Sequence, residues 1–330
     1  MSSATLDVAI MEACVAAAVA APSIYNTQPW TFRLEPDALT CQVRAAPERG
    51  LRHVDPDGRA LHVSAGACLF NLRVAMAHFG RAPVVRLLPC PGDPDLLAVV
   101  RPVARVPGGA DAGQADLYES IRRRHSSRLP FSDRPLPPRL PVELEEAART
   151  EGAVLRFPSS AETLRLLRLT AQAEQRNRMD VGRAMESRRW VHQDPYEAAD
   201  AGLPSALLGP QDTRERLPLR DFTAQRHPER LAARPFEAAP VVALLSTVHD
   251  RRTDWLRAGQ ALERVLLVAT AHGLRTSLLH QAMEWPDLRH DVLATPDGGG
   301  HAQMLVRLGY GPQGPAGPRR PVRDVIDTGP

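Results

Sequence analysis

Hydrophobic positions along the chain fall into blocks whose spacing switches between a helical and a strand period. Residues 3–21 are rich in alanine and leucine and predict a helix, which Pro22 ends. Apolar and polar residues then alternate at 31–34 and 39–43 around a turn at Pro36, as in a β-hairpin. By the same criteria we expect helices at 61–80, 115–125, 141–151, 161–189 and 255–273, and strands at 83–89, 96–103, 153–158, 240–248, 275–281 and 302–310.

A segment rich in glycine and proline, residues 107–113, divides this pattern and predicts a flexible linker. We therefore expect a first half over 1–112 and a second half over 113–330. The segments 65–80 and 258–273 both begin Ala-Gly-x-x-Leu and end in Gly, at a constant offset of 193 positions (258 minus 65). Each runs into an apolar strand. This matching order of elements favours an internal duplication over a chance likeness between alanine-rich helices.

The regular pattern fails between residues 190 and 222, where prolines and glycines interrupt every candidate element. A loop of about thirty residues in a compact chain is usually a lid, a binding loop or disorder. We expect a lid at 190–222.

Composition restricts the class of protein. The chain has 330 residues, of which 43% are apolar, enough for a large core. The net charge is only +3 and arginines interleave with acids, which argues against a nucleic-acid partner. The four cysteines are widely spaced without a CxxC pair, so we expect buried thiols in a reducing compartment and no metal site. Without a recognisable secretion signal or an apolar run of membrane-span length, we expect a cytoplasmic protein with no membrane partner.

The sharpest motif is Ala-Pro-Ser-Ile-Tyr-Asn-Thr-Gln-Pro-Trp at 21–30, between a helix and a strand. The polar edge of a flavin ring offers several acceptors and one donor, so amides and hydroxyls that both donate and accept suit it. Ser23, Asn26 and Gln28 provide such groups. The alternative is a capped loop in which these side chains satisfy their own backbone.

A second motif, Arg124-His-Ser-Ser-Arg128, lies at the expected end of a helix. Two arginines that flank a hydroxyl suit a phosphate, because guanidinium groups donate in a fork and the hydroxyl adds a neutral donor. An arginine-rich helix end can equally be a solvated face.

Residues 309–314 formally match GxGxxG, but Pro312 and Pro315 forbid the helix that a dinucleotide fingerprint requires. The sequence also lacks a GxSxG elbow, an HExxH pair and a Walker loop. We therefore assign no catalytic side chain.

Together these pieces resemble the FMN-binding nitroreductase superfamily, and most closely its Acg-type branch, in which one long chain is similar to a fused nitroreductase dimer. The resemblance covers almost the whole chain. It implies an α+β fold of two fused halves, each a mixed sheet flanked by helices, with a lid insertion.

The resemblance also implies which residues hold the FMN phosphate. The family binds it with an arginine-x-serine-x-basic motif, which Arg124, Ser126 and Arg128 match. Basic residues near the family's carboxyl terminus also reach the phosphate, which implies Arg319 and Arg320.

For the ring, the family contributes a proline-serine-x-x-asparagine-x-glutamine motif from the opposite subunit, and residues 22–28 fit it. The strand after the second Ala-Gly-x-x-Leu helix is expected to bring backbone groups near flavin N5. The ring-site residues implied in this way are Pro22, Ser23, Asn26, Gln28, His280 and Gln281.

The phosphate motif occurs only in the second half and the ring motif only in the first. We therefore expect one FMN site between the halves and no mirror-image site. The resemblance implies an FMN-dependent oxidoreductase that takes hydride from NAD(P)H and reduces a nitro compound, a quinone or a similar small acceptor. A flavin-sequestering protein with a closed lid, and a dedicated biosynthetic oxidase, remain as alternatives. The sequence leaves open whether two such chains form a homodimer.

Overall fold

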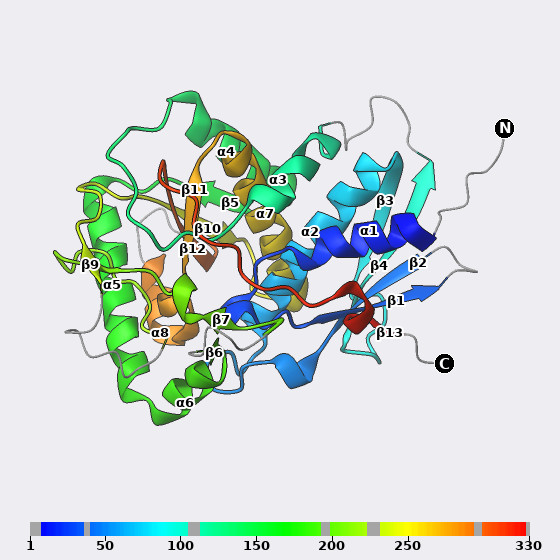
Figure 1. The fold of residues 1–330 in the computed structure, drawn as a ribbon, viewed down its shortest axis with the longest axis horizontal. Helices are drawn as coiled ribbons and strands as arrows, with labels where there is room; N and C mark the ends of the chain where they lie inside the picture. The colour runs from blue at the N-terminus through cyan, green and yellow to red at the C-terminus, as the bar shows by residue number, and fades with distance from the viewer. Residues whose placement is uncertain are drawn as a thin grey trace.

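The computed structural model describes residues 8–35, 40–104, 113–192, 199–222, 232–293 and 299–327. Within them two sheets with their helices lie next to each other (Figure 1). The predicted α+β class is confirmed. The start of the expected first helix, the hairpin turn, most of the expected linker and residues 193–198 of the expected lid lie outside the described residues.

The first half forms a mixed sheet in the order β13-β1-β2-β4-β3. Its elements are α1 (Val8–Val19), β1 (Trp30–Glu35), β2 (Thr40–Ala45), α2 (Arg59–His78), β3 (Arg81–Leu87) and β4 (Leu96–Ala104). The β1–β2 pair is antiparallel, as the alternating pattern predicted, with Phe32 opposite Val43. A strand from the far end of the chain, β13 (Ile326–Asp327), pairs parallel to β1. The carboxyl-terminal tail therefore returns from the second half to the first (Figure 1).

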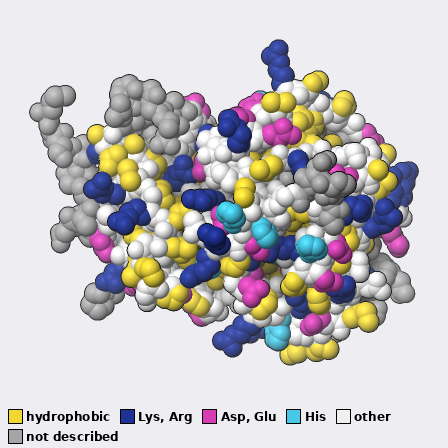
Figure 2. Space-filling model, turned by 180° about the vertical axis from the view of Figure 1, so that it is seen from behind, with side chains coloured by type: hydrophobic (Ala, Val, Ile, Leu, Met, Phe, Trp, Pro, Cys, Tyr) yellow, Lys and Arg dark blue, Asp and Glu magenta, His cyan; other side chains and the backbone are white. Residues whose placement is uncertain are grey.

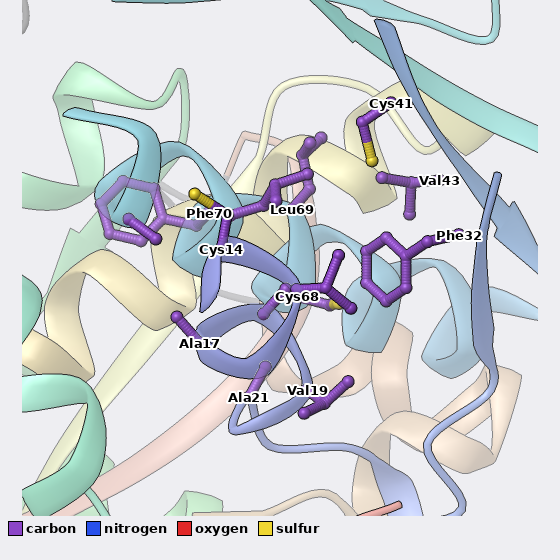
Figure 3. Packing of buried hydrophobic residues seen from close by; sticks show 14 of the residues in the cluster. Cys14, Ala17, Val19, Ala21, Phe32, Cys41, Val43, Cys68, Leu69 and Phe70 are labelled. Atoms are coloured by element: carbon purple, nitrogen blue, oxygen red, sulfur yellow. The ribbon is translucent and has the colours of Figure 1, made fainter. Parts of the chain in front are cut away.

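Helices α1 and α2 cover this sheet with faces that are almost wholly apolar. Phe32 and Val43 of the sheet, Cys68 and Leu69 of α2 and Cys14 of α1 belong to one buried cluster (Figure 3). Burial of a large apolar side chain contributes roughly 1.5–3 kcal/mol. The same cluster includes Ile121, Leu267 and Val325 of the second half, so this core joins the two halves.

Three of the four cysteines, Cys14, Cys41 and Cys68, are buried free thiols, as expected. Burial raises the pKa of Cys14 and of Cys41 to about 12, so these thiols stay protonated. The expectation is wrong for Cys90, which is exposed because it follows β3 in a proline-rich turn.

The second half forms a four-stranded antiparallel sheet in the order β11-β12-β10-β5, and an isolated parallel bridge joins Ser126 to Thr276 of β11. Its elements are α3 (Tyr118–Arg123), α4 (Arg139–Thr150), β5 (Val154–Arg156), α5 (Ser160–Met179), α6 (Val181–Arg189), β10 (Val241–Thr247), α7 (Arg252–Ala271), β11 (Arg275–Leu279), α8 (Pro286–Val292) and β12 (His301–Gly309). Alternate β10 residues pack to opposite faces, Leu245 in the cluster with α4 and α7 and Leu244 in the cluster with α5 and α8. Helices thus cover both faces.

The single helix expected at 161–189 is wrong. Helix α5 ends at Met179, and Asp180 adopts an extended conformation before α6 begins. The Asp180 carboxylate accepts a hydrogen bond from the backbone N–H of Arg183 at 2.9 Å, so it caps α6. The break needs no glycine or proline, which is why the sequence pattern did not predict it. The sequence also did not predict α8 or β13.

Helices α2 and α7 contain the two echoed segments and lie side by side between the sheets (Figure 1). Their closest approach is at Gly66 and Gly259. A Cβ on Gly259 would lie 2.1 Å from the carbonyl oxygen of Val63, and one on Gly66 would lie 2.2 Å from that of Leu256. Only glycine permits this contact. The two residues are related by the 193-position offset (259 minus 66), so equivalent positions of the two helices meet each other.

One helix among the described residues, α2, is long and apolar enough to cross a membrane, which corrects the expectation that no run approaches this length. However, 94% of its most apolar window is buried inside the protein. This burial is what a core helix requires.

On the face opposite to Figure 1, basic side chains lie beside acidic ones (Figure 2).

The described part of segment 190–222 contains short strands and a short 3₁₀ helix, Ser205–Leu207. β6 (Val191–His192) pairs with β7 (Leu203–Pro204), and β8 (Gln211–Asp212) pairs with β9 (Ala233–Arg234). The segment is nonetheless packed, because Leu203, Leu208 and Phe222 share a buried cluster with Tyr25 of the first half.

Candidate functional site

A pocket lies where the two halves meet, and the sequence motifs come together in it. The first half contributes residues 22–26 and one face of α2, and the second half contributes residues near 124–128 and the end of β11. The segment 190–222 and the carboxyl-terminal tail also line it. Of the eleven residues predicted for a cofactor, eight line this pocket: Pro22, Ser23, Asn26, Arg124, Ser126, Arg128, His280 and Arg319.

At one end of the pocket, which we call the cationic end, the guanidinium groups of Arg124 and Arg319 converge. Arg124 is 2% exposed and follows the last turn of α3. Its Nη2 donates to the carbonyl oxygen of Ala20 at 3.0 Å, and Nη2 of Arg319 donates to the same oxygen at 3.1 Å. Ala20 follows α1, whose carboxyl-terminal carbonyls carry partial negative charge and favour cations there.

The cationic end keeps donors without protein partners. Nε and Nη1 of Arg124 and Nε of Arg319 are buried and have no hydrogen-bond partner in the structure. Burial, followed by repulsion from Arg124, lowers the pKa of Arg319 to about 10. Burial and the same two arginines also lower the pKa of His125 to about 4, so this histidine is neutral. Unpaired buried donors are costly, and a phosphate would satisfy them.

One acidic side chain faces the cationic end. Glu263 of α7 is 0% exposed, and its Oε1 lies 3.3 Å from Nε of Arg124. Neither carboxylate oxygen has a hydrogen-bond partner. Burial raises the pKa of Glu263 to about 7, while Arg124 opposes this rise.

The loop 22–28 has an unusual backbone. Tyr25, Asn26 and Gln28 have φ values of 51°, 54° and 50°, in the left-handed region that residues other than glycine avoid. Hydrogen bonds compensate for this strain: Ser23 Oγ accepts from the N–H of Gln28 at 2.9 Å, and Ser64 Oγ of α2 accepts from that of Ile24 at 3.2 Å. The bond from Ile24 to Ser64 fixes the loop against α2 and so maintains the strained backbone.

The amides of this loop bond to the protein. Nδ2 of Asn26 donates to the carbonyl oxygens of Gly202 and Pro318 at 2.9 and 3.0 Å, and its Oδ1 accepts from Nη1 of Arg319 at 3.0 Å. Gln28 lies behind the pocket, where its amide joins Asp200 to the backbone N–H of Arg320. These two side chains fasten segment 190–222 and the tail to the loop.

Two further predicted residues also lie behind the pocket. Gln281 donates from Nε2 to the carbonyl oxygen of Pro218 at 3.0 Å. Arg320 donates from Nη1 to the carbonyl oxygen of Trp30 at 3.1 Å. Both contacts join parts of the fold, and their assignment to a cofactor stays a prediction.

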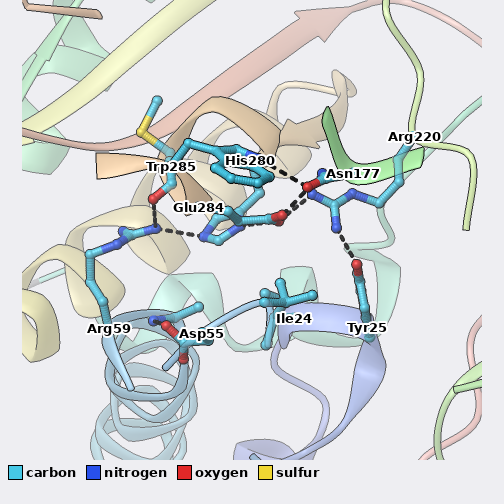
Figure 4. Close-up of polar contacts among 12 residues, drawn as sticks. Ile24, Tyr25, Asp55, Arg59, Asn177, Arg220, His280, Glu284 and Trp285 are labelled. Carbon is cyan, nitrogen blue, oxygen red and sulfur yellow. Dashed lines mark hydrogen bonds and ion pairs between the residues drawn. The ribbon is translucent and has the colours of Figure 1, made fainter. Parts of the chain in front are cut away.

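His280 stands at the other end of the pocket in a buried polar chain (Figure 4). Nη2 of Arg59 donates to Nε2 of His280 at 2.7 Å, which leaves Nδ1 to donate to Oε1 of Glu284 at 2.9 Å. Burial lowers the pKa of His280, so the ring is neutral. Burial alone would raise the pKa of Glu284, but Arg220 and His280 outweigh it and the pKa is lowered.

Arg220 of segment 190–222 lines the pocket and extends this series of polar contacts. Its Nη2 bonds to Glu284 and its Nη1 bonds to the hydroxyl of Tyr25 (Figure 4). Arg128 holds the same segment from the other side, donating to the carbonyl oxygen of Leu207 at 3.0 Å and lying 4.8 Å from the ring centre of Phe222. The pocket's free volume is about 140 Å³, below the roughly 300–1,000 Å³ of most ligand pockets. The pocket is therefore smaller in this closed arrangement than a typical ligand site.

Sequence reasoning missed Arg59, Arg220, Glu263 and Glu284. None lies in a recognised motif, and each has at least one partner far away in the chain. The separation of Arg220 and Glu284 is 64 positions.

A nitroreductase family model matches residues 121–310. The "Putative NAD(P)H nitroreductase Rv3131" of Mycobacterium tuberculosis is 34% identical over 89% of this chain and 83% of its own length. The chain therefore belongs to the nitroreductase family. The "Putative NAD(P)H nitroreductase acg" of the same organism is 29% identical over 92% of this chain and 90% of its own length, so the Acg-type branch fits.

Solved structures of low sequence identity are also similar. The FMN-dependent nitroreductase NfnB from Mycobacterium smegmatis in complex with NADPH is 16% identical, with a TM-score of 0.39, over 66% of this chain and 99% of that one. A nitroreductase with bound FMN from Bacteroides fragilis is 15% identical, with a TM-score of 0.37, over 62% of this chain and 93% of that one.

Proposed function

We propose that this protein is an FMN-dependent oxidoreductase of the nitroreductase type, with the flavin in the pocket between the halves. The observation that carries the proposal is the cationic end, where Nη1 of Arg124 and Nε of Arg319 are buried and have no hydrogen-bond partner among the described residues. A phosphate monoester supplies the acceptors that these donors lack. Membership of the nitroreductase family and the names of the relatives support the same assignment.

In this proposal Arg124, Ser126 and Arg319 hold the phosphate, and the loop 22–26 and the end of β11 flank the ring. The chemistry that bound FMN would supply is hydride transfer from NAD(P)H and onward electron transfer to a nitro compound, a quinone or a similar small acceptor. The chain's own work is to bind, orient and exclude water. Neutral His280 fits this role, because its Nδ1–H is committed to Glu284 and its Nε2 to Arg59.

We propose one FMN per chain. The α2 residues that line the pocket are small: Ala60, Val63, Ser64 and Ala67. Their α7 counterparts at the 193-position offset are larger: Thr253, Leu256, Arg257 and Gln260. A mirror-image pocket would be filled by these side chains. The contact of Gly66 with Gly259 supports the duplication that this comparison assumes, since equivalent residues meet across a two-fold axis.

A second function is favoured by the cover over the pocket. Arg220 and Arg128 both fasten segment 190–222 across it, and a lid that stays closed would make the protein a store for flavin rather than an enzyme. In either case we propose a cytoplasmic protein.

The experiment is a flavin assay followed by anaerobic reduction. Flavin released by heat from saturated protein is expected to reach one equivalent per chain and to be FMN. NADH or NADPH is then expected to bleach its visible absorbance, and a nitroaromatic or quinone to restore it. Bound FMN that dithionite reduces but neither nicotinamide bleaches would favour storage, and two equivalents would contradict the single site.

A further inference from the structure

We propose that Glu263 is the positioning residue and proton-accepting counter-ion of the cationic end: it holds Arg124 while the pocket lacks a phosphate and takes up a proton when a phosphate monoester binds. This inference rests on the proposed FMN site and adds a residue outside the motifs that located it.

The first support is the burial of the Glu263 carboxylate against a single cation. It is 0% exposed, forms an ion pair with Nε of Arg124 at 3.3 Å, and accepts no hydrogen bond of normal geometry from the described residues. Buried carboxylates normally accept several hydrogen bonds. Its ion-pair partner Arg124 lines the pocket, so the carboxylate is one side chain away from it.

The second support is the charge balance. The groups that act on Glu263 are Arg124 from the end of α3, Arg319 from the tail, and Asn71 and the Cys68 thiol from α2. Asn71 carries no charge and burial keeps the Cys68 thiol protonated, so the cluster holds two cations and one anion. A phosphate dianion would change the balance from +1 to −1 in a site closed to water. One proton on Glu263 restores neutrality.

The position of the Glu263 pKa allows this. Burial has already raised it to about 7, so a further anion near Arg124 is expected to move it above neutrality. The sign follows from linkage: the complex then binds more protons than the free protein, so FMN affinity falls as pH rises from about 7 to 9. The phosphate's own ionisation, near pH 6, acts below this window.

The test is calorimetric titration of the flavin-free full chain with FMN and riboflavin near pH 7.5, in buffers of different ionisation enthalpy. The variation of the observed heat with buffer gives the protons taken up. We expect uptake of a large fraction of one proton with FMN and none with riboflavin. Glu263→Gln should abolish the uptake and make FMN affinity independent of pH between 7 and 9.

The matched control is Glu174→Gln, because Glu174 is also buried with a raised pKa but lies beneath segment 190–222, where it bonds to Asp221. It should keep the proton uptake. If Glu263→Gln does not fold, carbon NMR of the wild-type Glu263 carboxyl with and without FMN provides the same answer. FMN binding without proton uptake, or uptake unchanged in Glu263→Gln, would overturn this inference alone. Binding of neither flavin would overturn it together with the proposed function.

Discussion

Two neighbouring parts of the pocket differ in how their polar groups are satisfied: the cationic end and the loop 22–28, which we call the loop end. They meet where Nη1 of Arg319 donates to Oδ1 of Asn26 at 3.0 Å. At the cationic end, Arg124 and Arg319 keep buried donors that no protein atom accepts. At the loop end, the amide of Asn26 bonds to Gly202, Pro318 and Arg319. The loop motif is the longer of the two sequence motifs. In this closed arrangement, however, its Asn26 amide joins separate segments of the protein.

This difference separates two tasks. The cationic end is organised before a ligand arrives, so it can contribute affinity without rearrangement. The loop end joins the loop, segment 190–222 and the tail, and we propose that it controls access. We therefore expect variants at the cationic end to act on FMN affinity and variants at the loop end to act on stability and on lid opening.

The largest effect is expected from Arg124→Ala. It removes two donors to the phosphate, each worth about 1.5–3 kcal/mol as a charge-assisted hydrogen bond, so FMN affinity should fall roughly 100-fold or more. Riboflavin affinity should barely change. Fluorescence titration of the flavin-free protein measures both. Arg122→Ala is the matched control, since this exposed arginine of the same helix should leave both affinities intact. Equal loss of the two ligands would show that Arg124 does not act through the phosphate.

Asn26→Ala tests the loop end. It deletes three hydrogen bonds that join separate segments, and at about 0.5–1.5 kcal/mol each the free energy of unfolding should fall by roughly 2–4 kcal/mol. Urea denaturation of the flavin-free protein gives this value. Gln281→Ala, which loses one such bond, should cost about a third as much. Unchanged stability together with a collapse of riboflavin affinity would mean that the amide instead binds the ring.

Arg220→Met tests the cover. The variant keeps an apolar stem but loses the contacts to Glu284 and Tyr25, so segment 190–222 should open more often. Stopped-flow reduction of bound flavin by dithionite should become several-fold faster. Arg214→Ala is an exposed change in the same segment and should have no effect. A wild-type rate in Arg220→Met would show that this latch does not limit access, and the storage function would lose its main support.

The sequence predicted what depends on local patterns. Helices α2 and α7 were predicted because apolar residues recur along them at helical spacing. Arg124 was assigned to a phosphate because a short motif marks it, and Arg319 was assigned from the family resemblance alone. What it missed depends on tertiary contact. Asp180 caps α6 within a run that remains helical by propensity, β13 exists only because the tail returns to β1, and Glu263 matters only because α7 faces the end of α3. The loop amides were expected to face a ligand, whereas in the structure Asn26 and Gln28 bond to protein groups more than 170 positions away.

The smallest effect is expected from Ser23→Ala, which decides between the two interpretations of the loop motif. In the structure Ser23 Oγ accepts from the backbone N–H of Gln28, a local bond that supports the left-handed backbone between them. Its loss should lower the free energy of unfolding by about 1 kcal/mol and change the affinities for FMN and riboflavin by less than about twofold, or about 0.4 kcal/mol. Ser23→Thr keeps a hydroxyl and should retain wild-type stability. A hydroxyl that instead bonds to the ring would be removed with a parallel loss of about tenfold in both affinities at unchanged stability. That outcome would make the loop end a ligand-binding surface like the cationic end and would end the division of tasks between them.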